Sequence, residues 1–265
     1  MKTIVVPTDF SVASQNAMNF AAQMAKVVGA SLYLVHVYQL PVSMDDMPSM
    51  VVPAEELKEA SDANLERVKE QLHQDFPGIV VESESILGDL VDELIDLGEK
   101  LHPYAIVGSR HHTSGVERLL FGRSGMALLK IPKIPVVVVP DTYTECCTTN
   151  IAMAYDGTDS IARQQRIKDF IEPLKTQLHL VHIQTTDSDA APKLENSFTD
   201  LMPICHRIKD DEFIHGVQTF IQDHHIDMLI IFPHKHSLME RFFLKIHSAE
   251  LLEHVSIPLV SLYED

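Results

Sequence analysis

Short apolar runs alternate along the first half of the chain with longer segments in which apolar residues recur every three or four positions. Short runs of this kind predict strands and the periodic segments predict helices. Ser11 and Asp89 are suited to cap the first turn of a helix, and Gly29 is suited to end one. The predicted strands are residues 4–6, 32–37, 79–81, 104–107 and 135–139, and the predicted helices are 11–28, 57–72, 89–101 and a segment reaching Leu128-Leu129.

Strands that are apolar almost throughout are typical of a parallel sheet with helices on both faces. The order strand-helix, repeated and closed by a strand, therefore predicts a doubly wound α/β sheet with five parallel strands. Ligands of such sheets bind beyond the carboxyl ends of the strands. Residues 39–53 interrupt the pattern and predict a surface loop rich in Met and Pro.

The pattern restarts after a polar stretch at residues 141–150. Residues 151–156 repeat the pattern of 4–9, and two further strand runs are repeated in the same order, 178–183 for 32–37 and 226–231 for the fourth strand. Glu117-Arg118 and Glu240-Arg241 each precede an Ile-Pro pair, with 17 residues from Glu to Ile in both cases. Ordered matches of this kind indicate an internal repeat.

The repeat predicts two tandem domains, residues 1–143 and 144–265, each with one five-stranded sheet. Their last strands, 136–139 and 259–262, are apolar edge strands that would be prone to aggregation if left open. We therefore expect the two sheets to pack through these strands as an intramolecular pseudo-dimer. Further homodimer formation is left open.

The length of 265 residues suits two domains, and 45% hydrophobic residues suffice for ordinary cores. A net charge of −17 argues against a nucleic-acid partner, since phosphate backbones require clustered Lys and Arg. The apolar runs are shorter than the roughly 18 residues of a membrane span. The first predicted strand begins at Ile4, and no signal-peptide pattern precedes it. Three cysteines, two of them adjacent, are not expected to form a disulfide framework. We expect a cytoplasmic protein.

Four segments together resemble the universal stress protein family. They are Pro7-Thr8-Asp9-Phe10-Ser11, Val35-His36-Val37, the fourth strand running into Gly108 and on to Gly122, and Ile134-Pro135 followed by four valines. The resemblance covers both halves of the chain. It implies a Rossmann-like fold of the adenine nucleotide alpha-hydrolase-like type and a non-enzymatic stress-response role. It also implies ATP or another adenine nucleotide as the ligand of the first domain, with Asp9, Val37 and the adjacent Thr8 at the adenosine end.

Nucleotide-binding members of that family carry Gly-x2-Gly-x9-Gly-Ser/Thr after the fourth strand. Glycines allow a close approach of phosphates, and the last pair begins a helix whose free amides favour anions. Gly108 fits the first glycine and Gly122 the last, whereas a histidine at 111 or 112 replaces the second. Arg123 stands at the usual Ser/Thr position, where it could pair with a phosphate or fill the site. The nucleotide-binding residues that the resemblance implies are Pro7, Thr8, Asp9, Val37, Val107, Gly108, Gly115, Gly122, Arg123 and Ser124.

The second copy departs further from the glycine pattern, because residues 232–237 and 245–248 carry bulky side chains where the glycines would be. We expect this half to bind ATP poorly or not at all. The distance from Gly108 to Glu117 is nine steps and that from Phe232 to Glu240 is eight. This difference favours a loop that is one residue longer in the first copy.

Other readings of the candidate residues are weaker. Histidines recur as His111-His112, His224-His225, His234/His236 and Cys205-His206, but none has the spacing of a paired ligand set, so no metal site is predicted. Asp9 and His36 lack an accompanying nucleophile, so no catalytic residues are predicted, although slow ATP hydrolysis stays open. The alternative function is a nucleotide-free scaffold that binds a protein or a small apolar ligand through the second half.

Overall fold

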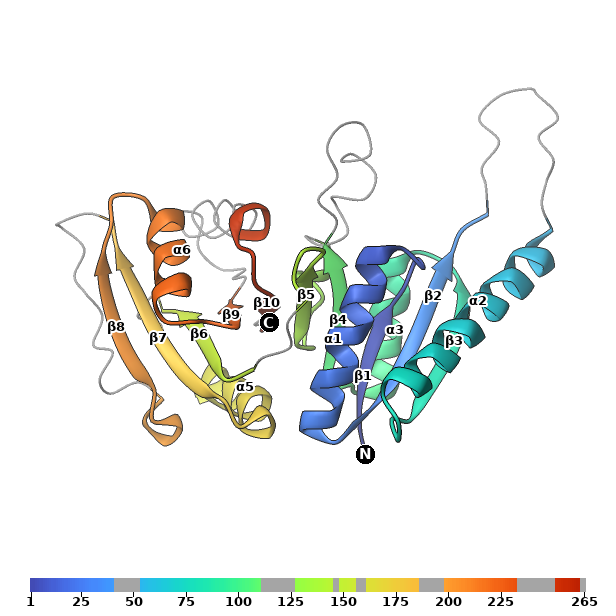
Figure 1. Cartoon of the computed structure of the whole chain (residues 1–265), viewed down its shortest axis with the longest axis horizontal. Coiled ribbons are helices and arrows are strands. Elements are labelled where there is room, and N and C mark those ends of the chain that lie inside the picture. Colours follow the sequence, from blue (N-terminus) through green and yellow to red (C-terminus); the bar gives the residue numbers. More distant parts are fainter. Residues whose placement is uncertain are drawn as a thin grey trace, which may run out of the picture.

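The computed structural model describes residues 1–40, 53–110, 127–144, 148–155, 161–185, 198–232 and 251–262. The strands in these residues form one sheet in the order β3-β2-β1-β4-β5-β10-β9-β6-β7-β8. Strands β1–β5 belong to the first half of the chain and β6–β10 to the second, and the two halves lie side by side (Figure 1). Strand pairing is parallel throughout except between β5 and β10. The predicted α/β fold class is confirmed.

The first half follows the predicted order of elements. Strand pairing in the order β3-β2-β1-β4-β5 leaves a change of winding direction between β1 and β4, which is where doubly wound sheets bind ligands. The bounds are β1 Lys2–Pro7, α1 Val12–Val28, β2 Ala30–Tyr38, α2 Ala54–Asp75, β3 Val81–Leu87, α3 Leu90–Leu101, β4 Ala105–Arg110 and β5 Val136–Pro140.

Local sequence signals set the ends of two of these helices. The Ser11 side chain accepts a hydrogen bond from the Ser14 amide, and Gly29 ends α1 in the left-handed conformation with φ 69°. The Asp89 side chain accepts bonds from the amides of Val91 and Asp92 at the start of α3. These caps were predicted from the sequence and are confirmed. Strand β3 begins at Val81, two residues later than predicted.

The second half repeats the arrangement with shorter elements. Its bounds are β6 Asn150–Ala154, α5 Ile161–Ile171, the 3-10 helix η2 Glu172–Leu174, β7 Gln177–Gln184, the 3-10 helix η4 Thr199–Leu201, β8 Ile204–Lys209, α6 Phe213–Asp223, β9 Met228–Ile231 and β10 Leu259–Ser261. Sequence analysis did not predict β8, because this edge strand carries polar side chains and has no buried residue.

Equivalent strand pairs confirm the internal repeat. Ile4 of β1 lies opposite Ala105 of β4, and Ile151 of β6 lies opposite Met228 of β9. The other strand pairs follow the same register, as do the hydrogen bonds at their ends. The paired residues of β6, β7, β9 and β10 therefore have defined counterparts in β1, β2, β4 and β5.

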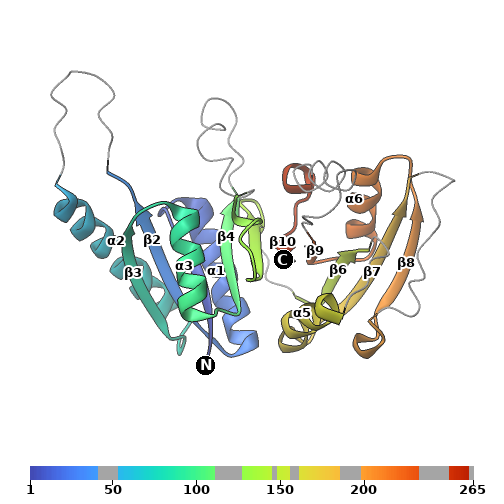
Figure 2. The ribbon, with the colours of Figure 1, turned by 180° about the vertical axis from the view of Figure 1, so that it is seen from behind.

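The two halves join through their last strands, as predicted. Strands β5 and β10 pair antiparallel, with Val137 opposite Val260 at the centre. The Ser261 hydroxyl, on β10, donates to the carbonyl oxygen of Leu129 at 2.6 Å. The arrowheads of β2 and β7 nevertheless point toward the same side of the molecule (Figures 1 and 2). Each strand is rotated relative to its neighbour, and over the strands between β2 and β7 these rotations add up and reverse the strand direction.

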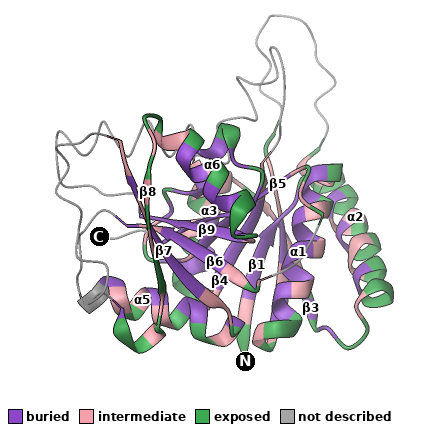
Figure 3. Ribbon diagram, turned by 60° about the vertical axis from the view of Figure 1, so that its left-hand side comes forward, coloured by how far each residue is buried: buried purple, intermediate pink, exposed green. Residues whose placement is uncertain are grey.

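Helices cover both faces of the sheet. Side chains of α1, α2 and α5 contribute to one hydrophobic core, and those of α3, α6 and residues 251–255 contribute to the other. Buried residues gather on the strands and on the inward sides of the helices, while the outer side of α2 is exposed (Figure 3). In the described residues we find no helix that is long and apolar enough to span a bilayer.

Candidate functional site

Thr8 anchors the turn that leaves β1. Its amide donates to the carbonyl oxygen of Val35 on β2 at 2.9 Å. Its hydroxyl lies 3.1 Å from the Ser14 hydroxyl, and it accepts a hydrogen bond from the Phe10 amide, also at 3.1 Å. Thr8 is only 6% exposed. The hydroxyl of this predicted site residue thus holds β1 against the first turn of α1.

Asp9 follows at the edge of the sheet formed by the carboxyl ends of its strands. Its side chain is exposed, and its Oδ1 accepts a hydrogen bond from the Ser11 amide at 3.0 Å. Pro7 lies opposite Val35 at the end of the strand register, and β2 continues to Tyr38. Asp9, just after β1, and Val37, near the end of β2, therefore lie at the same edge of the sheet, where the family resemblance places the adenosine end.

His36 supports this edge from β2. Its Nδ1 lies 2.7 Å from the carbonyl oxygen of Thr8, and because a carbonyl can only accept, Nδ1 carries the hydrogen. The His36 ring is 4.5 Å from the ring of Phe10, which has a left-handed φ of 62°. Such a backbone conformation is strained for an aromatic residue and persists only where contacts hold it. His36 thus has a structural partner in the turn after β1.

Val107 and Gly108 come from β4, across the change of winding direction. Val107 is fully buried in the core. A Cβ atom added to Gly108 would lie 2.6 Å from Leu128 Cδ1 and 3.7 Å from Pro7 Cγ. A side chain at position 108 would therefore need Leu128 to shift, and the end of β4 lies close to the end of β1 here.

The other predicted site residues cannot be placed. Gly115, Gly122, Arg123 and Ser124 lie outside the described residues, as do His111 and His112. The part of the site that would hold the phosphates therefore stays a sequence prediction.

The corresponding edge of the second half keeps the backbone contacts of the first. The Tyr155 amide donates to the Val181 carbonyl at 2.9 Å, and His182 Nδ1 lies 3.2 Å from the Tyr155 carbonyl. These contacts repeat those of Thr8 with Val35 and His36. The side chain differs, because Tyr155 is 5% exposed and its ring meets Phe198 edge-on at 6.1 Å.

The strand register also identifies the counterpart of Gly108. Because Ala105 and Met228 occupy equivalent positions, Gly108 corresponds to Ile231 rather than to Phe232. Ile231 to Glu240 is nine steps, equal to the distance from Gly108 to Glu117. The comparison of nine steps with eight was therefore wrong, and the second copy gives no support for a longer first loop.

Large side chains fill the space near this position of the second half. The guanidinium of Arg163, on α5, lies 4.4 Å from the centre of the Phe232 ring. Arg163 is 2% exposed and Phe232 is 6% exposed. Where the first half has a threonine and a glycine at the strand ends, the second half has a tyrosine and an isoleucine.

Comparison with known proteins agrees with this architecture. Residues 1–140 match the universal stress protein family. This chain belongs to that family.

Two relatives differ in how much of the chain they cover. Universal stress protein MJ0531 of Methanocaldococcus jannaschii is 30% identical over 140 residues, which are 52% of this chain and 81% of the relative. Universal stress protein Slr1230 of Synechocystis is 24% identical over 294 aligned positions, covering 98% of this chain and 99% of the relative. This universal stress protein therefore has a relative of the same tandem length.

A solved structure shares the tandem fold. A universal stress protein from Archaeoglobus fulgidus superposes with a TM-score of 0.72 at 19% identity, covering 97% of this chain and 94% of that one. A Pseudomonas aeruginosa protein, PA1789, titled functionally unknown, gives a TM-score of 0.64 at 14% identity, with 100% and 93% coverage. At these identities the likeness establishes the fold.

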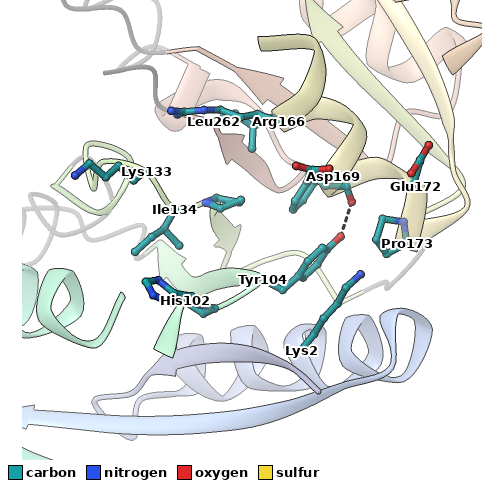
Figure 4. Close-up of a pocket in the computed structure, with 13 residues that line it drawn as sticks. Lys2, His102, Tyr104, Lys133, Ile134, Arg166, Asp169, Glu172, Pro173 and Leu262 are labelled. Atoms are coloured by element: carbon teal, nitrogen blue, oxygen red, sulfur yellow. Dashed lines mark hydrogen bonds between the residues drawn. The ribbon is translucent and has the colours of Figure 1, made fainter. Parts of the chain in front are cut away.

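A cavity of about 560 Å³ in this universal stress protein lies between the halves (Figure 4). It is lined near the amino ends of β1, β4 and β5 by Lys2, Tyr104 and Ile134, and by Arg166 and Asp169 of α5. A second groove of about 470 Å³ runs between α1 and α2. Neither cavity is lined by the predicted nucleotide-binding residues, although Phe10, next to Asp9, lines the second groove.

Sequence analysis missed one group of polar side chains. His179, His206 and His224, from β7, β8 and the end of α6, converge in space although 45 residues separate the first from the last. Cys205, which was weighed together with His206, cannot join them because adjacent strand residues face opposite sides of the sheet. In the sequence, the group is marked only by His179, a polar residue inside an otherwise apolar strand run.

Proposed function

We propose that the first half binds an adenine nucleotide, with ATP as the expected ligand, and that the protein acts as a non-enzymatic stress-response module. The ligand would lie beyond the carboxyl ends of β1, β2 and β4. The division into domains at 1–143 and 144–265 is part of this proposal, with nucleotide bound by the first domain only.

The contrast between equivalent positions carries the proposal. Thr8 and Gly108 at the edge of the first half correspond to Tyr155 and Ile231 in the second. The strand register and the supporting histidine contact are alike in both halves, so at these two positions the difference lies in the side chains. Small residues let a ligand come closer to the backbone than large ones do, although the Cβ side of Gly108 is itself taken by Leu128.

The described residues fit the adenosine end of a nucleotide. The exposed Asp9 carboxylate can accept hydrogen bonds from ribose hydroxyls, and the partly buried Val37 offers an apolar side chain at the same edge. The protein as a whole carries a charge of −17, which repels a free nucleotide at long range. Phosphate binding would therefore depend on local backbone amides in the segment after β4.

The same residues give no support for a catalytic role. In the part of the edge that the structure describes, the Thr8 hydroxyl contacts Ser14 and Phe10, and His36 Nδ1 is bonded to a backbone carbonyl. Neither arrangement is a nucleophile next to a base. We therefore expect binding without turnover.

Titration calorimetry of the full chain with ATP tests the proposal. We expect one binding site per chain, an affinity at least tenfold weaker in Asp9→Asn, and no change in Asp92→Asn, which removes the same charge from the exposed side of α3. Gly122→Glu tests the phosphate end that the sequence predicts, and it should abolish binding.

Three results would contradict the proposal. The first is an absence of heat with native protein from which small molecules have been removed. The second is equal ATP affinity in the native protein, Asp9→Asn and Gly122→Glu, which would mean that the nucleotide binds elsewhere. The third is ATP hydrolysis well above a buffer blank that is lost in Asp9→Ala, which would make the protein an enzyme.

A further inference from the structure

Three histidine side chains meet on one face of the second half. His179 comes from β7, His206 from β8, and His224 follows the last residue of α6. One ring nitrogen from each lies within 4.8 Å of the other two. His179 Nδ1 and His206 Nε2 are already 3.1 Å apart.

The fold assembles this group from elements that are separate in sequence. Val181 lies opposite His206 in the parallel pairing of β7 and β8, and side chains two residues apart on a strand share a face. His179 and His206 are thus diagonal neighbours beneath α6. Phe220 of α6 packs 4.9 Å from the His206 ring and 4.7 Å from the His224 ring, which directs the end of the helix toward the two strands.

Imidazole binds a metal ion in its neutral form, through the lone pair of one ring nitrogen. The rings of His179 and His206 both pack against Phe220, with ring centres 6.3 Å and 4.9 Å from it, so both imidazoles adjoin an apolar side chain.

Packing alone leaves this group incompletely satisfied. The single contact between His179 and His206 uses one nitrogen of each ring, and the buried Nε2 of His179 has no hydrogen-bond partner. His179 is 6% exposed, so water is largely excluded from it. When His179 Nδ1 acts as the ligand, this Nε2 carries the ring hydrogen, so the orphaned atom is not itself part of the metal site.

We propose that His179, His206 and His224 bind one divalent transition-metal ion, with Zn²⁺ as the preferred ion. Zn–N bonds of about 2.0–2.1 Å in a tetrahedral site put ligand nitrogens about 3.3 Å apart. One pair is already at 3.1 Å, and side-chain rotation of the exposed His224 can close the remaining separation from 4.8 Å or less. Exposure of His224 leaves the fourth position open to water.

Three imidazole ligands favour transition-metal ions over Mg²⁺ and Ca²⁺. Imidazole nitrogens suit Zn²⁺, Cu²⁺ and Ni²⁺, whereas Mg²⁺ and Ca²⁺ require oxygen ligands. The group consists of three histidines with no carboxylate among its described members. The site therefore differs in position and chemistry from the nucleotide-binding edge, and its test is independent of ATP.

Calorimetry of the full chain with ZnCl₂, after removal of metals with a chelator, tests the proposal. We expect one tight site per chain in the native protein and at least a tenfold loss of affinity in both His206→Ala and His224→Ala. Loss in the exposed His224 variant does not depend on damage to the core. His73→Ala, which removes an exposed histidine from α2, is the matched control and should bind as the native protein does.

Cobalt substitution gives an independent readout of geometry. Co²⁺ bound to three histidines and water should give visible absorption bands of a four- or five-coordinate site, absent in His224→Ala. Because the chain has 15 histidines, weak additional binding is expected to remain in every variant. Equal Zn²⁺ affinity in the native protein, His206→Ala and His224→Ala would overturn the proposal, and so would an absence of tight binding by the native protein.

Discussion

The hydroxyl of Tyr104 donates a hydrogen bond to the carbonyl oxygen of Phe170, and the two rings stack with their centres 5.6 Å apart and an angle of 8° between their planes. Tyr104 precedes β4 in the first half, whereas Phe170 belongs to α5 in the second. Burial raises the pKa of Tyr104, so its phenol stays protonated as a donor. This contact joins the halves near the amino ends of β1 and β4, at the edge of the sheet opposite to Asp9 and Val37, and Figure 4 shows Tyr104 pointing toward α5.

Removal of this hydroxyl should weaken the junction. We expect Tyr104→Phe to lower the free energy of unfolding by about 1 kcal/mol, the usual net value of one hydrogen bond. Tyr104→Ala should lower it by about 3–5 kcal/mol, because the ring contact is lost as well. Urea denaturation measures both. Tyr38→Phe, at the partly exposed end of β2, is the control and should have no measurable effect.

The strand junction offers a second test. Ser261 is fully buried, and its hydroxyl donates to the Leu129 carbonyl of the other half. We expect Ser261→Ala to cost about 1–3 kcal/mol of unfolding free energy, because the carbonyl is left buried without its partner. Thermal or urea unfolding can detect this loss. Ser83→Ala on the edge strand β3 should change stability much less, and equal effects of the two variants would argue against a special role of the junction.

Gly108 and Leu128 should be energetically coupled. A Cβ at position 108 meets Leu128 Cδ1, so we expect Gly108→Ala to destabilise the protein by about 1–3 kcal/mol. Shortening Leu128 removes that clash. In a double-mutant cycle with Leu128→Ala, the combined loss should be smaller than the sum of the two single losses by about 1 kcal/mol. Additive losses would mean that the glycine is required for another reason.

The histidine group predicts a dependence of stability on pH in the metal-free protein. The pKa of His206 is about 4 in the folded chain against an ordinary value of 6.5, so between these values the unfolded chain binds the extra proton. The urea midpoint should therefore fall as the pH decreases from 6.5 toward 4. His206→Gln should flatten this fall, whereas His73→Gln should leave it unchanged. Measurement requires a chelator, since bound metal would add its own pH dependence.

Local signals made much of the fold predictable from the sequence. The bounds of α1 follow from Ser11 and Gly29, because capping hydrogen bonds and a left-handed φ depend on residues next to each other in the chain. The repeat and the pairing of β5 with β10 also followed, because apolar edge strands must be covered. Strand β8 was missed because an exposed edge strand lacks the apolar pattern from which strands are recognised.

The sequence by itself determined the order of elements, their caps and the duplication. Only the tertiary structure decided that Gly108 corresponds to Ile231, that Leu128 fills the space beside this glycine, and that His179, His206 and His224 converge. The physical reason is distance along the chain. Periodicity and capping act between near neighbours, whereas strand register and the packing of α6 on β7 and β8 bring together residues whose spacing in sequence carries no signal.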